Sequence, residues 1–412
     1  MTEKVVREPG DVDESERRRP LAVGVPREMS PGERRVALTP AVVPALAKAG
    51  LRVVVEAGAG AAAGFPDQAY ADKGAAVGTR DEVLGAHVVT MVRVGAAGPE
   101  SPELAALRPG QVVVGMAAPL AAPAVAAAVA ARGATLFALE LVPRITRAQA
   151  MDVLSSQANV AGYKAVLLAA GALPKMFPLL TTAAGTIAPA RVFVVGAGVA
   201  GLSAIATARR LGAVVEAYDV RPAVKEEVQS LGARFVELPL ETGQEGAGAG
   251  AYARALPEEA LRRQRELMAA TVASSDVVIT TAQVQGGRAP TLVTADMVAG
   301  MAPGSVVVDL AAEQGGNCEL TRPGETVEVD GVRVLGPLNL PATVPYHASL
   351  TYAKNVSNFL LLLMREGTLV IDEEDDVVRD TLVCRDGRVV HPRVREALGE
   401  PPAAERREEV TA

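Results

Sequence analysis

Aromatic residues, cysteine and histidine are scarce in this sequence. Tryptophan is absent and aromatic residues make up 3% of the chain, which argues against the stacking platforms that bind single-stranded nucleic acid. The two cysteines, Cys318 and Cys384, form no CxxC pair, and His87, His347 and His391 lie far apart. The ligand spacing of a zinc site is therefore missing, and we expect no metal centre.

Positive charge and long apolar runs are also limited. The net charge of −7 gives no sign of the basic face that nucleic acids require. The first twenty residues are charged and lack the apolar core of a signal peptide, so we expect a disordered arm over residues 1–20. The longest uncharged run, residues 110–131, is long enough to raise the question of a membrane span. Pro119 and Pro123 interrupt it, which favours a buried strand, a turn and a helix.

Most of the chain alternates short apolar runs with helical stretches, a pattern that predicts βαβ units and parallel sheets. A second alternating series begins at residues 191–195, and a long helix over residues 345–365 returns to the first series. We predict an α/β fold of two Rossmann-like domains with parallel sheets and a cofactor cleft between them. The expected boundaries are residues 21–145 plus 341–395 for a discontinuous first domain, 146–340 for a second domain, and 396–412 for a mobile tail.

The most specific motif is the string GAGVAG at residues 196–201. The apolar run VFVV precedes it and the helical pattern VAGLSAIATARRLG follows it, as in the strand–turn–helix of dinucleotide-binding domains. In that motif Gly196 allows the tight turn, Gly198 lets a pyrophosphate approach the backbone, and Gly201 lets the helix pack on the strand. An α/β turn with incidental glycines is the alternative. The expected pyrophosphate contacts are Gly196, Ala197, Gly198, Val199 and Gly201.

An acidic residue ends the next predicted strand, VVEAY. Asp219 lies 18 residues after Gly201, where a carboxylate accepts hydrogen bonds from the adenosine ribose hydroxyls. Its negative charge repels a 2′-phosphate, so the sequence favours NAD over NADP. Arg221 weakens this preference, because an arginine at this place can accept a 2′-phosphate.

Polar residues punctuate the otherwise apolar stretch PRITRAQAMDVLSSQAN. We expect a long helix over residues 147–171, capped by Thr146 with Gln149 three residues later. Two interpretations remain open: a solvated helix face with a capping residue, or a set of donors and acceptors for the nicotinamide carboxamide and its ribose. The residues expected on this one face, after Arg144, are Gln149, Asp152, Ser155 and Ser156.

A glycine-rich segment at residues 240–257 interrupts the alternation. Loops of this length are uncommon in a compact α/β domain and are usually functional or disordered. Its glycines give the free chain a large conformational entropy, so we predict a mobile loop.

Four strings together resemble the alanine dehydrogenase/transhydrogenase family, over the residues from 21 to about 392: GVPREMSPGERRVALTP, PRITRAQAMDVLSSQAN, GAGVAGLSAIATARRLGAVVEAYDVR and DLAAEQGGNCE. RITRAQAMD and the loop ending in GAYA resemble the transhydrogenase branch most closely. The resemblance implies that residues 240–257 are the family's mobile loop, whose tyrosine, Tyr252 here, closes over bound nucleotide.

The resemblance also implies roles for individual residues. Those at the nicotinamide end, which position the ring and supply no acid or base, are Arg144, Gln149, Asp152, Ser155 and Tyr252. The further cofactor contacts implied beyond the glycine turn are Asp219, Val220, Arg221, Ala251, Ala282 and Gln283.

The function implied by the resemblance is direct hydride transfer from NADH to NADP⁺ bound on a partner subunit. It is coupled to proton movement through a separate membrane subunit, because the sequence resembles the short form of the family without its own membrane helices. The resemblance further implies a homodimer that is cytoplasmic and peripheral on the inner face of the plasma membrane. Such transfer needs positioning but no general base, since no O–H or N–H proton leaves with the hydride.

An NAD-dependent alanine dehydrogenase is the alternative, and a non-catalytic NAD-sensing module is a third possibility. Alanine dehydrogenases of the family hold the keto acid with a lysine and a histidine of the first domain. The corresponding stretches, MVRVGAAGPE and GQVVVGMAAPL, lack that histidine and a clear lysine, although amine oxidation calls for acid–base groups. Arg35 in ERRVALTP matches the family's N-terminal arginine, and we interpret it as a structural relic or as an ordinary surface arginine.

Overall fold

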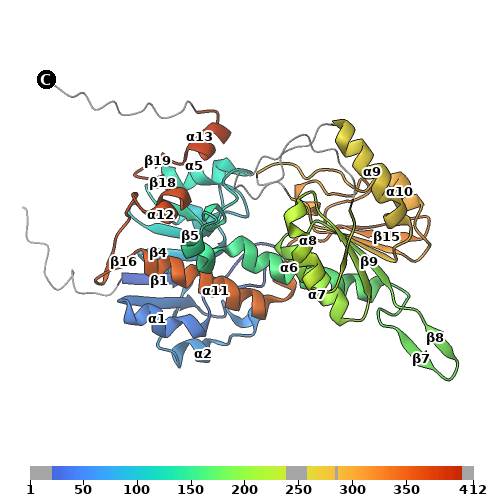
Figure 1. Cartoon of the computed structure of the whole chain (residues 1–412). Coiled ribbons are helices and arrows are strands. Elements are labelled where there is room, and N and C mark those ends of the chain that lie inside the picture. The colour runs from blue at the N-terminus through green and yellow to red at the C-terminus, as the bar shows by residue number, and fades with distance from the viewer. Residues whose placement is uncertain (1–20, 238–257, 284–285, 401–412) are drawn as a thin grey trace, which may run out of the picture. The chain divides into compact units, whose positions relative to one another are not determined.

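A computed structural model of the chain describes residues 21–237, 258–283 and 286–400. These residues form two compact units. Unit 1 comprises residues 21–30, 36–151 and 353–400, and unit 2 comprises residues 31–35 together with the described part of 152–352. Each unit has a largely parallel sheet with helices packed on it (Figure 1), which confirms the predicted class of two Rossmann-like folds. The predicted arm and the predicted mobile loop, with Ala251 and Tyr252, lie outside the described residues.

The sheet of unit 1 runs in the order β19-β18-β6-β5-β4-β1-β2-β3. Strands β1 to β6 pair in parallel, and β18 and β19 are antiparallel additions at one edge. The central strands are rich in valine and buried, as expected for a parallel sheet covered on both faces. The strands are β1 (Leu21–Val25), β2 (Leu51–Glu56), β3 (Ala76–Gly78), β4 (Val88–Arg93), β5 (Val112–Met116), β6 (Thr135–Ala138), β18 (Leu382–Arg385) and β19 (Arg388–Val389).

The uncharged run at residues 110–131 forms β5 and helix α5, with Pro123 in the first turn of the helix, as its prolines predict. In the described parts of the chain, we find no helix with the length and apolar character needed to cross a membrane. From Pro392 the chain forms a short helix, α13, whose Val394 is buried and which ends at Ala397, two residues into the predicted tail of residues 396–412. The helices of unit 1 are α1 (Val43–Lys48), α2 (Asp67–Ala71), α3 (Arg80–Leu84), α4 (Pro102–Ala105), α5 (Pro123–Ala131), α12 (Asp376–Thr381) and α13 (Pro392–Ala397).

The sheet of unit 2 runs in the order β11-β10-β9-β12-β13-β15-β14, with only β14 antiparallel among the strands described. The chain passes from β9 to β10 on one side and later to β12 on the other, so β9 and β12 flank the point where the strand order reverses. Ligands of such folds bind beyond the carboxyl ends of these strands. The strands are β9 (Arg191–Val195), β10 (Val214–Tyr218), β11 (Arg234–Phe235), β12 (Val277–Thr280), β13 (Val306–Asp309), β14 (Thr326–Val329) and β15 (Val332–Leu335).

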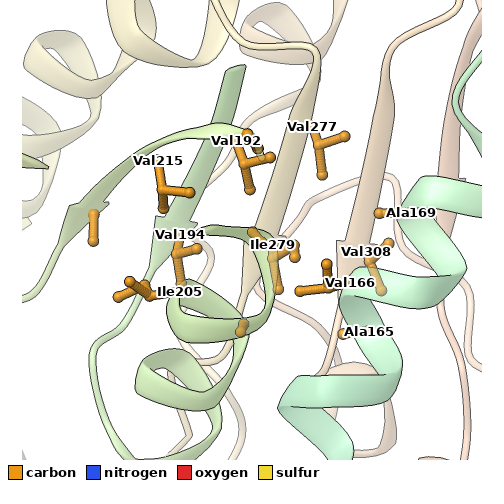
Figure 2. Packing of buried hydrophobic residues seen from close by; sticks show 14 of the residues in the cluster. Ala165, Val166, Ala169, Val192, Val194, Ile205, Val215, Val277, Ile279 and Val308 are labelled. Atoms are coloured by element: carbon orange, nitrogen blue, oxygen red, sulfur yellow. The ribbon is translucent and has the colours of Figure 1, made fainter. Parts of the chain in front are cut away.

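One face of this sheet is covered by α6 and α7. Figure 2 shows the valine and isoleucine side chains of β9, β10, β12 and β13 packed against small residues of α6 and against Ile205 of α7. Alanines such as Ala165 and Ala169 let α6 lie close to the strands, because they carry no bulky side chain. The helices of unit 2 are α6 (Val153–Ala172), α7 (Val199–Arg210), α8 (Lys225–Ser230), α9 (Glu258–Ala273) and α10 (Ala295–Ala299), and α11 (Pro345–Leu362) contributes residues to both units.

Helix α6 begins later than the sequence predicts. Residues Thr146–Met151 form a 3₁₀ helix, η4, and the α-helix starts at Val153. The cap is Asp152, whose extended backbone interrupts the helix and whose Oδ1 accepts a hydrogen bond from the Ser155 N–H at 2.9 Å. The predictions that Thr146 caps this helix and that Gln149 shares a helix face with Asp152 and Ser155 are therefore wrong.

A hairpin that the sequence pattern did not reveal follows α6. Strands β7 (Leu180–Thr182) and β8 (Gly185–Ile187) pair only with each other and project from the rest of unit 2 (Figure 1). All of residues 179–188 are exposed, including the apolar side chains of Leu179, Leu180 and Ile187.

Candidate nucleotide-binding site

The glycine turn joins β9 to α7. Gly196 has a φ of +99°, a conformation that L-residues with side chains rarely adopt. A Cβ on Gly201 would lie 1.9 Å from the carbonyl oxygen of Gly196, so only glycine lets α7 start this close to β9. A Cβ on Gly198 would meet no described atom within 4 Å, which leaves that side of the turn open. The turn thus has the shape that a pyrophosphate needs at a helix N-terminus.

Asp219 follows β10 and reaches back to this turn. Its Oδ2 accepts a hydrogen bond from the Ala197 N–H at 2.8 Å, and its Oδ1 accepts one from the Arg221 N–H at 2.9 Å. The Arg221 guanidinium also forks onto the carboxylate, at 2.9 Å from Nε and 3.0 Å from Nη2. Burial alone would raise the pKa of Asp219, but the hydrogen bonds from Arg221 and Ala197 outweigh it and keep that pKa below its ordinary value. Val220, between the two, packs against the apolar core.

These contacts refine the prediction made for Asp219. Both carboxylate oxygens are already engaged in the structure, so ribose hydroxyls can bond to Asp219 only where the Arg221 side chain gives way. While the Arg221 guanidinium is bonded to Asp219, its charge is neutralised and those donors are not available to a 2′-phosphate.

The segment after β12 lies on another side of the turn. The Thr281 hydroxyl donates to the Gly196 carbonyl at 3.0 Å. A Cβ on Gly196 would lie 2.6 Å from Thr281 Oγ1 and 3.3 Å from the Ala282 nitrogen, which shows how closely the two segments approach. Gln283 is exposed, and its Nε2 donates to the Leu310 carbonyl at 3.0 Å. Thr281 and Ala282 therefore form a wall beside the glycine turn.

Asp152 and Ser155 lie together at the start of α6 in unit 2. The Ser155 hydroxyl donates to Asp152 Oδ2 at 2.5 Å, in addition to the capping bond from its N–H. The same helix packs tightly on α7, since a Cβ on Gly162 would lie 2.0 Å from the Ala200 carbonyl oxygen. The Asp152–Ser155 pair stands at the start of α6 and the glycine turn at the start of α7, and these two helices pack directly on each other.

Arg144 and Gln149 belong to unit 1, where both side chains are exposed in the stretch that follows β6. The backbone next to Gln149 is held from α11: the Ala150 carbonyl accepts hydrogen bonds from the side-chain amides of Asn355 at 2.8 Å and Asn358 at 2.9 Å. No local pattern pointed to these two asparagines, because they lie about 200 residues from the segment they hold.

Arg35 is buried with 3% of its surface exposed, so the interpretation as a surface arginine is wrong. Its Nε and Nη2 fork onto Glu33 at 2.8 and 2.7 Å, Nη1 donates to Gln157 Oε1 at 2.8 Å, and Nη2 also donates to Asn339 Oδ1 at 2.9 Å. Asn339 Nδ2 closes the network with a 2.9 Å bond to Glu33. Burial would raise the pKa of Glu33, but the hydrogen bonds and charge of Arg35, helped by Asn339, lower it to about 2. Arg35 is therefore the centre of an internal polar network in unit 2.

A half-buried acid with a buried carboxylate, which the sequence analysis did not single out, lies in unit 1. Glu140 follows β6 and accepts hydrogen bonds from the backbone N–H groups of Ala117 (2.8 Å) and Ala118. Ala118 has a φ of +45°, unusual for a residue other than glycine. Burial raises the pKa of Glu140 to about 7 against the lowering effect of these backbone hydrogen bonds. The residues after β4 and β5 are VGAAG (94–98) and AAPL (117–120), with no lysine or histidine among them.

Comparison with known proteins agrees with the resemblance seen in the sequence motifs. The N-terminal domain of the family described as Alanine dehydrogenase/PNT matches residues 24–161, and its C-terminal domain matches residues 165–392. An NAD(P) transhydrogenase subunit alpha chain of Rhodospirillum rubrum is 45% identical over 377 residues, covering 90% of this chain and 98% of that protein. An alanine dehydrogenase of Mycolicibacterium smegmatis is 29% identical over 390 residues, covering 92% and 98% of the two chains.

Among solved structures, a transhydrogenase and an alanine dehydrogenase differ in their sequence identity to this chain but hardly in their structural similarity to it. A transhydrogenase from Sinorhizobium meliloti superposes with a TM-score of 0.78 at 45% identity, covering 90% of this chain and 99% of that chain. An L-alanine dehydrogenase gives a TM-score of 0.77 at 27% identity, covering 92% and 99%. The fold is thus shared by both branches, and the sequence is closer to the transhydrogenases. From the two domain matches and these identities, the chain belongs to the alanine dehydrogenase/transhydrogenase family.

Proposed function

We propose that the chain is the NAD(H)-binding subunit of a proton-translocating NAD(P) transhydrogenase. In this role it holds NADH so that a hydride passes directly to NADP⁺ on a partner subunit, and a separate membrane subunit couples the transfer to proton movement. The observation that carries the proposal is the 45% identity to the Rhodospirillum rubrum subunit over 98% of that protein's length. The test is whether the purified chain transfers hydride only when an NADP-binding transhydrogenase subunit is added.

The geometry of unit 2 supports NAD(H) as the nucleotide. The open side of Gly198 and the N-terminus of α7 suit a pyrophosphate, and Asp219 lies at the end of β10 where an adenosine ribose binds in this fold. Thr281 and Ala282 form the adjoining wall. The residues that we propose to contact the cofactor are Gly196, Ala197, Gly198, Val199, Gly201, Asp219, Val220, Arg221, Ala251, Ala282 and Gln283.

At the nicotinamide end, the chain's task is to orient the ring and to keep water away from it. Bound NADH would supply the hydride itself. Because transfer between two nicotinamide rings releases no O–H or N–H proton, this chain needs no group that gains or loses a proton. The Ser155 hydroxyl, held by Asp152, can offer a fixed polar contact, and the exposed amide of Gln149 offers both a donor and an acceptor. The residues proposed for this end are Arg144, Gln149, Asp152, Ser155 and Tyr252.

The alternative function, an alanine dehydrogenase, is favoured by one observation, the TM-score of 0.77 to a solved L-alanine dehydrogenase. A fold alone does not determine activity. The stretches after β4 and β5, where alanine dehydrogenases of the family carry their keto-acid lysine and histidine, contain neither residue here. Identity to the alanine dehydrogenase of Mycolicibacterium smegmatis is also lower, at 29%.

The choice of nucleotide should depend on Asp219. We expect the free chain to bind NADH far more tightly than NADPH, and Asp219→Ala to narrow the difference by about tenfold, which is the effect of losing one charged hydrogen bond. The reason is twofold: the ribose loses its acceptor, and Arg221 loses the carboxylate that now neutralises it. Titration of each variant with both nucleotides measures the ratio of dissociation constants.

Arg221→Ala is the matched control for this experiment. It leaves the Asp219 carboxylate bound to the backbone N–H groups of residues 197 and 221 and frees only the two positions held by the guanidinium, so the preference for NADH should persist. Equal affinities of the unaltered chain for NADH and NADPH would contradict the proposed role of Asp219.

We propose that the chain forms a homodimer through the hairpin β7–β8. The hairpin exposes apolar side chains on a projecting element, as an interaction surface does. Light scattering should therefore show a dimer, and the double substitution Leu180→Ser with Ile187→Ser should shift it towards the monomer. Val214→Ser is the control, because Val214 is as exposed (43%) as Leu180 (40%) and Ile187 (41%) but lies on β10. A monomeric unaltered chain, or an equal effect of Val214→Ser, would contradict the proposal.

A further inference from the structure

The string DLAAEQGGNCE forms a second polar network in unit 2, around Asp309 at the end of β13. Asp309 is fully buried and its carboxylate is held entirely by neutral donors in the described structure. Hydrogen bonds of this kind to an ionised acceptor are stronger than those between neutral groups. Oδ2 accepts from the N–H groups of Asn317 (2.7 Å) and Cys318 (2.9 Å) and the Thr321 hydroxyl (2.7 Å), and Oδ1 accepts from the Ala311 N–H (2.9 Å) and the Thr280 hydroxyl (2.9 Å).

The loop closes onto this carboxylate because glycine stands at position 316. Gly316 has a φ of +83°, and a Cβ there would lie 2.9 Å from Asp309 Oδ2. The absence of a side chain therefore brings the N–H groups of Asn317 and Cys318 within reach of the same oxygen. The backbone of Asn317 is fixed by this arrangement.

Asn317 is itself completely buried and connects two distant segments. Its Oδ1 accepts a hydrogen bond from the Ala282 N–H at 2.9 Å, while its Nδ2 donates to the carbonyls of Ala282 and Pro290, both at 2.8 Å. Its own carbonyl accepts from the N–H groups of Leu292 (2.8 Å) and Val293 (3.0 Å). One asparagine thus holds both ends of the segment between β12 and α10.

Asn317 makes two of these hydrogen bonds to Ala282, which belongs to the wall beside the glycine turn. Its amide bonds both the N–H and the carbonyl of Ala282, so the backbone of Ala282 is fixed from two directions. Ala282 in turn lies against Gly196, as the 3.3 Å approach of its nitrogen to a Cβ built there shows. An apolar residue at position 317 could fill the same space but would leave Ala282 unheld.

We propose that Asp309 and Asn317 are positioning residues for the nucleotide site, an inference that rests on the proposed function. Asp309 fixes the backbone of Asn317, and the Asn317 amide fixes Ala282 at the distance from the glycine turn that a dinucleotide requires. Neither residue touches the ligand. Their effect reaches it through the placement of the wall, because ligand contacts are only as well placed as the groups that support them.

The test compares Asn317→Ala with the unaltered full-length chain in two measurements. Amide hydrogen exchange in the free protein should become at least about tenfold faster at Ala282, whose N–H loses its acceptor. NADH titration should show a dissociation constant about tenfold higher. This is the cost of losing one buried hydrogen bond to NADH that forms only when the wall is correctly placed. If Asn317→Ala does not fold, Asn317→Asp replaces it: the shape and the acceptor remain, both donors are lost, and NADH affinity should still fall.

Thr321→Val is the matched control. It removes one hydrogen bond from Asp309 but leaves the Ala282–Asn317 pairing intact, so NADH affinity should stay within about twofold even where the melting temperature falls. Unaltered NADH affinity in Asn317→Ala overturns the positioning role, and so does an equal loss of affinity in Thr321→Val. Failure of the unaltered chain to bind NADH overturns the proposed function instead, and the exchange measurement then still decides whether Asn317 fixes Ala282.

Discussion

Purified alone, the chain should interconvert alanine and pyruvate at no measurable rate, with either NAD⁺ or NADH and ammonia. Amine oxidation requires groups that take up a proton and bind a carboxylate, and residues 94–98 and 117–120 supply no lysine or histidine for this purpose. Addition of the NADP-binding subunit of a transhydrogenase, together with NADP⁺, should start hydride transfer from NADH. Chromatographic separation of NADPH from NADH measures the product directly.

Placement of the nicotinamide should decide the rate of this transfer. Gln149→Asn keeps the amide but shortens its reach by one methylene, and a displacement on the order of 1 Å can cost about a hundredfold in rate. We therefore expect turnover to fall by about that factor while the dissociation constant of NADH changes only a few-fold. Gln68→Asn makes the same substitution at an exposed helical site of unit 1 and should leave turnover unchanged.

Two outcomes would refute these expectations. Interconversion of alanine and pyruvate by the chain alone, at an ordinary enzymatic rate, would replace the proposed function with alanine dehydrogenase. Unchanged turnover in Gln149→Asn would show that Gln149 only occupies the surface of η4 and contributes nothing at the nicotinamide.

Glu33→Gln should destabilise the protein by about 3–5 kcal/mol, the usual cost of leaving a buried charge without its partner. The reason is the burial of Arg35, which loses a forked carboxylate and keeps only neutral acceptors at Gln157 and Asn339. Chemical denaturation gives the change in the free energy of unfolding. The double variant Glu33→Gln with Arg35→Met should lose less free energy of unfolding than the two single variants lose in sum, since the two side chains interact directly.

The same carboxylate predicts an acid limit of stability. The pKa of Glu33 is lowered from 4.5 to about 2 in the folded chain, so its contribution is present above pH 4.5 and is lost as the pH falls towards 2. A shift of this size corresponds to about 3 kcal/mol, in line with the effect of Glu33→Gln. Between pH 5 and pH 2, the free energy of unfolding should therefore decrease less for Glu33→Gln than for the unaltered chain. Chemical denaturation at each pH measures it.

Arg147→Met provides the control. Arg147 forks onto Asp375 with bonds of 2.8 and 3.0 Å, as Arg35 does onto Glu33, but its side chain is 46% exposed. Water screens such a pair, so its loss should lower the free energy of unfolding far less than Glu33→Gln does. Equal effects of Arg147→Met and Glu33→Gln would show that burial is not the source of the stability assigned to Arg35.

The sequence predicted the sheets well because their strands carry a strong local signal. Buried parallel strands appear as short runs of valine and isoleucine, and β9 and β10 have the predicted bounds. The glycine turn was equally accessible, since the spacing of Gly196, Gly198 and Gly201 reflects local backbone geometry. Hairpin β7–β8 was missed because each of its strands is only three residues long, partly polar and exposed along its whole length. Such strands leave no pattern of buried residues in the sequence.

The polar networks could not be predicted, because their partners are far apart in the sequence. Arg35 meets Gln157 and Asn339 across more than a hundred residues in each case. Asp309 and Asn317 stood in a recognised motif, but only the structure shows that Asn317 binds Ala282. The start of α6 was misjudged for a different reason: Thr146 and Asp152 are both good caps, and the choice between them depends on the 3₁₀ segment that precedes the helix.

The pairing of β6 with β18 has a consequence for synthesis on the ribosome. These strands are about 240 residues apart, a distance that takes on the order of 12–50 s to translate at about 5–20 residues per second. Throughout that interval the apolar edge of β6 has no partner, and an unpaired edge of this kind promotes association with other chains. The sheet of unit 2 is translated in full by residue 335, before β18 emerges. The nascent chain can therefore complete its second unit while the first still lacks its last strands.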